Sequence, residues 1–239
     1  MAAMSLLLSL LCLFTSVLAN TEKTIFLGPD PVTLPLTHPT LSDLRLHTLT
    51  HTNGTLRTQL NAQFPSSEHP HGPATWLILD NLTPKQRYEV RVCWPATQPT
   101  EFSLSTFSLS TVWDTPELIA SLHAYTTSRR HPHDDAAPVP PKGSGDSSER
   151  EASILLLRIL AAADYFTTDA SLMSNVPPVD VDVILDPFLY NVLPRSIAGT
   201  AIYIVGVAIV GFLLAGMIAS SLQGLVASSP RQESVKKRQ

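Results

Sequence analysis

An uninterrupted apolar run near the C-terminus constrains this chain more than any other feature. Residues 197–218 contain no Asp, Glu, Lys or Arg. At about 1.5 Å per residue they form a helix of about 33 Å, which is long enough to cross a hydrocarbon core of about 30 Å. The sequence therefore predicts one transmembrane helix, which we assign to residues 197–222. A glycosylphosphatidylinositol (GPI) attachment signal is disfavoured, because such a signal ends in its apolar stretch and here polar residues follow.

The charges on the two sides of this run predict its orientation. Basic residues dominate the C-terminal flank, and acidic residues dominate the N-terminal flank. They are Arg231, Lys236, Lys237 and Arg238 (with Glu233) after the run, and Asp180, Asp182 and Asp186 (with Arg195) before it. Flanks rich in Lys and Arg stay in the cytosol. We therefore expect residues 223–239 to be a basic cytosolic tail and the N-terminal part of the chain to be lumenal.

The N-terminus has the features of a secretory leader. Residues 4–18 form an apolar run that is too short to span a bilayer comfortably. It ends in Val17, Leu18 and Ala19, with small residues where a signal peptidase cleaves. We expect residues 1–19 to be a signal peptide removed before Asn20; the alternative is an uncleaved N-terminal anchor. Leader and spanning helix together predict a single-pass type I membrane protein.

The last four residues resemble a sorting signal. Lys236 and Lys237 occupy the fourth and third positions from the end, which resembles the dilysine signal that the COPI coat binds on type I proteins. The resemblance implies retrieval to the endoplasmic reticulum. The alternative is an ordinary stop-transfer cluster that contacts anionic lipid headgroups.

Residues 20–125 contain short β segments separated by turns, which predicts a lumenal β-sandwich. The clearest strand runs from Tyr88 to Val92, where apolar residues alternate with Glu89 and Arg91. Residues 76–79 and 102–106 predict two further strands. Leu82, Pro84 and Tyr88 have the spacing of the tyrosine corner, so the domain resembles fibronectin type III sandwiches. An unrelated antiparallel β domain with a similar corner is the alternative.

Two segments separate this domain from the spanning helix. Residues 126–148 are polar and rich in Pro, Gly and Ser, which predicts a disordered linker. His131, His133 and Asp134 in the linker lack the spacing of a metal site. For residues 149–196 we expect a helix over 154–166, opened by a capping box at Ser148 and Glu151, and then an extended juxtamembrane segment. In that segment valines alternate with aspartates, which we assign to its wet face.

Modification sites and the cysteines fit a lumenal domain. N-glycosylation sequons begin at Asn53 and Asn81; Pro84 directly after the second makes Asn53 the better candidate. Cys12 lies in the leader, so the mature chain keeps Cys93 alone and cannot form an intrachain disulfide. Cys93 lies between the apolar residues Val92 and Trp94, so we expect its thiol to be buried. The alternative is an intermolecular bridge.

No motif for catalysis or for a cofactor is visible. The sequence contains no nucleophile elbow, glycine-rich phosphate loop, zinc-ligand spacing or framed carboxylate pair. Its net charge of -4 suggests no nucleic-acid partner. We expect a protein without enzymatic activity, metal or cofactor. In the spanning helix, Gly211, Ala215 and Ala219 share one face and would let another helix approach closely, although small residues are common in such helices anyway.

Three segments, taken in order, resemble the fungal GPI mannosyltransferase II co-activator family, and the resemblance covers nearly the whole chain. They are Asn20, Thr21, Glu22, Lys23; then Tyr88, Glu89, Val90, Arg91, Val92, Cys93, Trp94; then Asp186, Pro187, Phe188, Leu189. The resemblance implies a non-catalytic subunit that binds the polytopic transferase adding the second mannose to GPI precursors in the endoplasmic reticulum. The alternatives are a cargo receptor or adhesion-type protein of the endoplasmic reticulum or Golgi and, last, a lumenal hydrolase.

Overall fold

The computed structural model describes residues 19–35, 40–129 and 149–227. The chain divides into two units, one that ends at Pro194 and one that begins at Arg195. The predicted leader apart from Ala19 lies outside the described residues. So do residues 130–148 of the predicted linker and residues 228–239 of the predicted tail.

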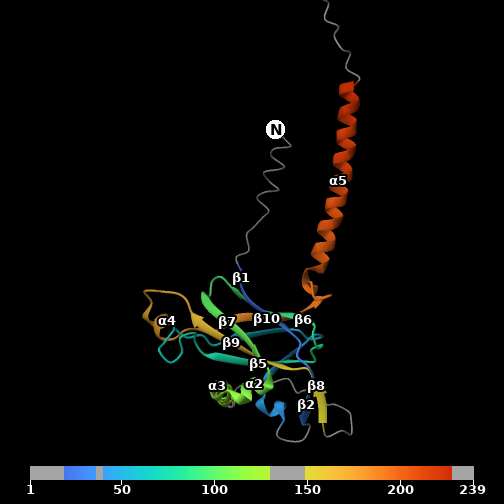
Figure 1. The fold of residues 1–239 in the computed structure, drawn as a ribbon. Helices are drawn as coiled ribbons and strands as arrows, with labels where there is room; N and C mark the ends of the chain where they lie inside the picture. Colours follow the sequence, from blue (N-terminus) through green and yellow to red (C-terminus); the bar gives the residue numbers. More distant parts are fainter. Residues whose placement is uncertain (1–18, 36–39, 130–148, 228–239) are drawn as a thin grey trace, which may run out of the picture. The chain divides into compact units, whose positions relative to one another are not determined.

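The first unit is built on two β-sheets (Figure 1). The first sheet is antiparallel and has the order β1, β6, β10, with β4 and β11 both paired to β10. These strands are β1 (Ala19–Leu27), β4 (Thr55–Leu60), β6 (Arg87–Pro95), β10 (Val179–Leu189) and β11 (Leu193–Pro194). β6 and β10 therefore occupy the centre of the sheet, although about 90 residues separate them in the chain.

The second sheet has the order β3, β5, β9, β7. β3 is parallel to β5, and the other pairs are antiparallel. Its strands are β3 (His47–Thr50), β5 (Ala74–Asp80), β7 (Thr100–Phe107) and β9 (Leu155–Ala163), and a separate two-stranded sheet joins β2 (Val32–Pro35) to β8 (Glu149–Ala152). A 3₁₀ turn, η1 (Leu41–Leu44), precedes β3.

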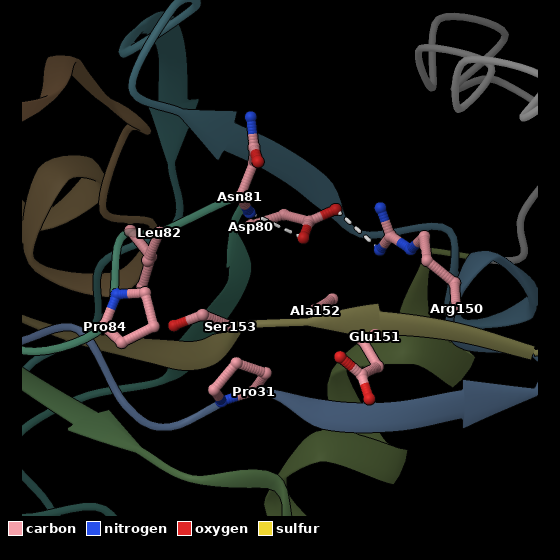
Figure 2. Close-up of a pocket in the computed structure, with 9 residues that line it drawn as sticks. All are labelled: Pro31, Asp80, Asn81, Leu82, Pro84, Arg150, Glu151, Ala152 and Ser153. Carbon is pink, nitrogen blue, oxygen red and sulfur yellow. Dashed lines mark hydrogen bonds and ion pairs between the residues drawn. The ribbon is translucent and has the colours of Figure 1, made fainter.

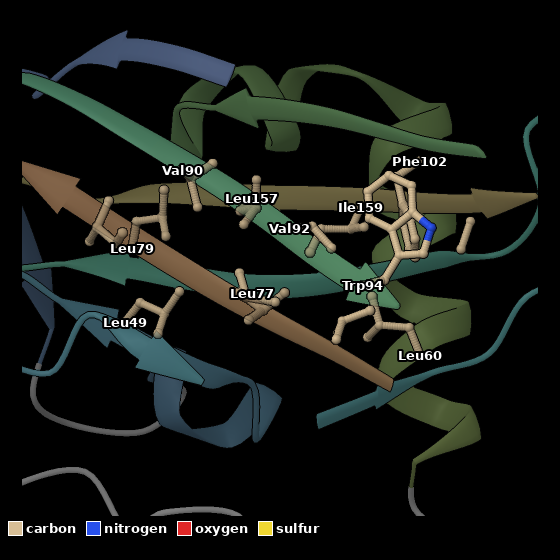
Figure 3. Packing of buried hydrophobic residues seen from close by; sticks show 14 of the residues in the cluster. Leu49, Leu60, Leu77, Leu79, Val90, Val92, Trp94, Phe102, Leu157 and Ile159 are labelled. Carbon is tan, nitrogen blue, oxygen red and sulfur yellow. The ribbon is translucent and has the colours of Figure 1, made fainter. Parts of the chain in front are cut away.

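The two large sheets pack face to face around one hydrophobic core (Figure 3). Side chains that alternate along each strand point into it, as expected for strands with one buried face. The first sheet contributes Tyr88, Val90, Val92, Val181 and Val183, and the second contributes Leu49, Leu77, Leu79, Leu157 and Ile159. The rings of Trp94 and Phe102 meet edge to face at 4.6 Å between centroids, which joins β6 to β7 across the core.

Two helices cover the outer face of the second sheet. They are α2 (Leu109–Asp114) and α3 (Pro116–Ser128), and they bury Val112, Leu118 and Leu122 against Trp76 and Leu156. The Ser108 hydroxyl caps α2 by accepting a hydrogen bond from the Thr111 amide at 3.1 Å. Pro116 begins α3, where its missing N–H is not needed. α3 continues to Ser128, so the prediction that a linker begins at residue 126 was wrong.

The predicted helix over residues 154–166 was also wrong, because most of that segment is strand β9. β9 lies between β5 and β7, with one face in the inter-sheet core and the other under the helices. A strand covered on both faces is apolar at nearly every position and lacks the alternation that identifies a strand. Arg158 interrupts the run over the ring of Phe107, 5.1 Å from its centroid, and burial lowers the pKa of its guanidinium.

The prediction of a capping box was also wrong, and so was the predicted domain boundary at residue 125. Glu151 lies in β8, paired with Thr33 of β2, and no helix opens there. The helix in this region is the short α4 (Ala170–Ser174). β9 is a central strand of the second sheet and β10 a central strand of the first, so the β unit extends to Pro194. Composition marked residues 126–148 as a boundary, but long-range strand pairing crosses it.

The predicted fold class is confirmed: the unit is mainly β, with short helices. The likeness to fibronectin type III domains does not extend to strand order. In the immunoglobulin-type layout the strand after the tyrosine corner and its successor share a sheet, whereas β6 and β7 lie in different sheets.

The second unit contains a long apolar helix, as the sequence predicted. A 3₁₀ turn, η2 (Arg195–Ile197), leads into α5 (Ala198–Ala227). Within the stretch Arg195–Gln223 an 18-residue window has a mean hydropathy of 2.5, and the stretch is long and apolar enough to cross a membrane. Its side chains are exposed in the isolated chain.

Candidate functional site

The passage from β5 to β6 contains the residues predicted to form a tyrosine corner. The Thr83 amide donates to the Tyr88 hydroxyl at 2.9 Å, and that hydroxyl donates to Gln86 Oε1 at 3.1 Å. Tyr88 and Leu82 are buried, while Pro84 is exposed. The hydroxyl therefore fixes the point at which β6 begins, and with it the register of the first sheet.

Both predicted glycosylation sequons lie at this end of the β unit. Asn53 is exposed in the turn between β3 and β4. Asn81 is exposed at the corner, in a left-handed conformation with φ 55°. His51 connects the two turns, since its Nδ1 lies 3.0 Å from the Asn81 carbonyl oxygen.

A shallow depression of about 240 Å³ lies beside the corner (Figure 2). The Asp80 carboxylate accepts from the Asn81 amide at 2.6 Å and from Arg150 at 2.9 Å. The buried Ser153 hydroxyl donates to the Pro29 carbonyl at 2.6 Å. These polar groups already bond within the chain, so a ligand would have to displace them. The remaining lining residues are Pro31, Leu82, Pro84, Glu151 and Ala152.

The outer face of the first sheet carries a buried charge cluster that the sequence did not reveal. Glu89 and Asp186 stand directly opposite each other on β6 and β10, and both are buried. One Arg91 nitrogen lies 3.3 Å from Glu89 and 3.9 Å from Asp186. Lys23 on β1 donates to Glu89 at 3.1 Å. Like charges placed opposite each other destabilise a sheet, so the two basic side chains stabilise this arrangement.

The aspartates of β10 do not all lie on a wet face. Asp180 is exposed and accepts from Gln59 at 2.9 Å. Asp182 pairs with Arg57 through two bonds of 2.7 and 2.8 Å, which lower the pKa of Asp182 and raise that of Arg57. Asp186 is buried, which contradicts the prediction. The alternation was correct, but on this face Asp186 lies opposite the buried Glu89 and 3.9 Å from Arg91.

Cys93 is half-buried on the same outer face, and the prediction of a buried core thiol was wrong. Val92 and Trp94 point into the core, so alternation along β6 directs the residue between them outward. The Thr21 hydroxyl lies 3.5 Å from its sulfur.

No group of three or more His, Cys, Asp or Glu side chains within residues 19–35, 40–129 and 149–227 is arranged to hold a metal ion. His131, His133 and Asp134 lie outside these ranges, as do Lys236 and Lys237 of the tail.

The small-residue stripe of α5 is open. A methyl group built on Gly211 would meet no atom of the described chain within 4 Å, and the same holds for Gly206. Gly211, Ala215 and Ala219 follow one another at four-residue intervals and share a face of α5. Nothing within the described chain therefore requires a glycine at position 211.

Sequence reasoning missed the charge cluster because it depends on register. Alternation places Glu89 and Arg91 on the same outward face of their strand, and both lie there, although Glu89 is buried. That Asp186 lies opposite Glu89 follows from the pairing of β10 with β6. The three aspartates of β10, a strand without Lys or Arg, were the available signal. Alternation alone does not say which strands are neighbours.

Comparison with known proteins identifies a family. A family model described as GPI-mannosyltransferase II co-activator (Pga1) matches residues 10–136, just over half of the chain. The matched residues include strands β1 to β7 with helices α2 and α3, and they end before β8. No curated protein and no solved structure gives a significant match.

Proposed function

Because the chain belongs to the GPI-mannosyltransferase II co-activator family, we propose that it is a non-catalytic subunit of the membrane enzyme that adds the second mannose to GPI precursors. The family match is the observation that carries this proposal. The description of the family as a co-activator supports a role without catalysis.

The proposed partner is the polytopic transferase subunit, and the proposed contact runs through α5. Association between helices in a membrane depends on close packing, which small residues allow. Gly211, Ala215 and Ala219 offer such a face on α5.

The test is to replace the chain in its own cells with tagged variants and to measure co-purification with the transferase together with GPI intermediates. Depletion is expected to accumulate the one-mannose precursor. Gly211→Leu is expected to reduce co-purification at least tenfold, because leucine prevents close approach. Gly206→Leu is the matched control: it lies on roughly the opposite face, equally open, and should leave co-purification unchanged.

A normal GPI profile after depletion would rule out the proposed function. Equal loss of co-purification for Gly211→Leu and Gly206→Leu would instead retain the function and exclude the stripe as the contact.

We propose the endoplasmic reticulum membrane as the location, with a type I topology in which the leader is removed and the β unit is lumenal. The charge difference across the apolar stretch supports this orientation. In this topology Asn53 is the preferred glycan acceptor, since its turn is exposed and no proline follows its sequon.

We propose that Lys236 and Lys237 form a retrieval signal for the COPI coat. Replacing both with serine is expected to move the protein from the endoplasmic reticulum to later compartments in cells that lack the transferase partner, as measured by acquisition of Golgi-type glycans. The partner is removed because it could retain the chain independently. An unchanged glycan pattern in those cells would contradict the retrieval signal.

A further inference from the structure

The β10–β11 hairpin ends in a turn that presents apolar side chains to the outside. Leu189 and Val192 are joined by a hydrogen bond of 3.0 Å from the Val192 amide to the Leu189 carbonyl. Within the turn, Tyr190 is 98% exposed, and Val192 is 78% exposed. We call residues 189–192 the hairpin tip.

The hairpin tip is held rigidly in an unusual conformation. Tyr190 and Asn191 both have positive φ, 51° and 59°, as in a type I′ turn. Asn tolerates this region, but a tyrosine rarely adopts it. The Asn191 side chain accepts from the Arg87 amide at 2.8 Å and donates to the Lys85 carbonyl at 3.1 Å. The tip is therefore clamped to the start of β6 with its tyrosine directed away from the unit.

Basic residues flank the tip. Lys85 and Arg87, whose backbone groups hold Asn191, are both exposed, and Arg195 follows β11 directly. An exposed tyrosine and valine bordered by basic side chains suit the interfacial layer of a bilayer. There aromatic residues are enriched, and phosphate groups attract Lys and Arg.

Chain length places the tip near that layer. The candidate span begins at Arg195, three residues after Val192, and its uncharged run begins at Ile197 after Ser196. The five residues from Val192 to Ile197 span at most about 18 Å. The headgroup region of each leaflet is about 5–7 Å thick. The short connection therefore keeps the tip close enough to the bilayer surface to reach the headgroups beside the helix.

We propose that the hairpin tip inserts Tyr190 and Val192 into the headgroup layer of the bilayer and so fixes the β unit against the membrane at a second point. The occupant of this apolar surface is lipid. The proposal rests on the proposed function in one respect, that α5 spans a bilayer, and it needs no transferase.

The experiment uses the full chain reconstituted in vesicles of phosphatidylcholine and phosphatidylserine. Tyr190→Trp keeps an aromatic side chain at the tip, and the spectrum of the parent chain with its three tryptophans is subtracted. Trp at position 190 is expected to emit at shorter wavelength than in water. Lipids brominated close to the headgroup are expected to quench it at least twofold.

Phe166→Trp is the matched control. Phe166 is 86% exposed, and it follows Asp164, whose amide bonds to the Pro99 carbonyl beyond the far end of β6. Its emission should match that in water and ignore brominated lipid. Equal quenching at both positions, or water-like emission at position 190, would overturn the proposal. So would shielding of position 190 that appears only when the transferase is added. None of these results bears on the co-activator role, which the GPI profile tests separately.

Discussion

Replacing Arg91 with methionine is expected to destabilise the β unit by about 3 kcal/mol. Arg91 is 23% exposed at its side chain and lies between Glu89 and Asp186, both buried. Methionine has a similar volume but no charge. The two facing carboxylates would therefore have one basic neighbour fewer than in the parent chain. Removing one partner of a buried ion pair costs about 3–5 kcal/mol, and partial exposure places Arg91 at the lower end. The melting temperature should fall by about 6–12 °C.

Arg57→Met is the matched control for this prediction. Arg57 makes two bonds to Asp182, a closer pair than any in the cluster, but its side chain is 85% exposed. Exposed pairs contribute little to stability because water screens their charges, so the expected fall is small. Thermal unfolding of both full-length variants in detergent, followed by near-ultraviolet circular dichroism, makes the comparison. Equal falls would show that the buried carboxylates do not depend on Arg91.

Leu157→Ala is expected to cost about 3 kcal/mol, and Leu160→Ala less than about 1.5 kcal/mol. Leu157 is fully buried in the inter-sheet core, whereas Leu160 points to the other face of β9 and is half-buried. Truncating a buried leucine costs about 2–5 kcal/mol because a cavity remains. Denaturant unfolding of the full-length variants in detergent measures both values.

This pair also distinguishes the strand from the helix that the sequence predicted. In a helix, Leu157 and Leu160 would share a face, being three residues apart, and their losses would be similar. In a strand they lie on opposite faces. Losses that agree within about 0.5 kcal/mol would contradict β9 as the structure has it.

Local sequence patterns predicted the strands that have one wet face. β6, β7 and β10 show alternation, and the turn before Tyr88 carries the spacing of a corner. The same alternation, applied strictly, would have placed Cys93 on the outer face. That error came from its apolar neighbours and not from any missing information.

Strands covered on both faces, and all long-range pairings, could not be predicted in this way. β9 has helices on one face and the first sheet on the other, which removes every polar position except Arg158. Ser108 and Pro116 are local signals for the starts of α2 and α3. They were missed because the whole of residues 20–125 was interpreted as β structure. Glu89 and Asp186 face each other because β6 pairs with β10, which follows the predicted linker in the sequence. No local pattern predicts that pairing.

The place of β9 and β10 in the sheets has a consequence for biosynthesis. A nascent chain emerges N-terminus first, so β1 to β7 leave the ribosome before the two strands that complete their sheets exist. Until then β5 and β6 each lack the strand that pairs with one of their edges. β10 ends at Leu189 and α5 begins at Ala198. Closure of the sandwich and delivery of the apolar helix to the membrane therefore belong to the same brief interval of synthesis.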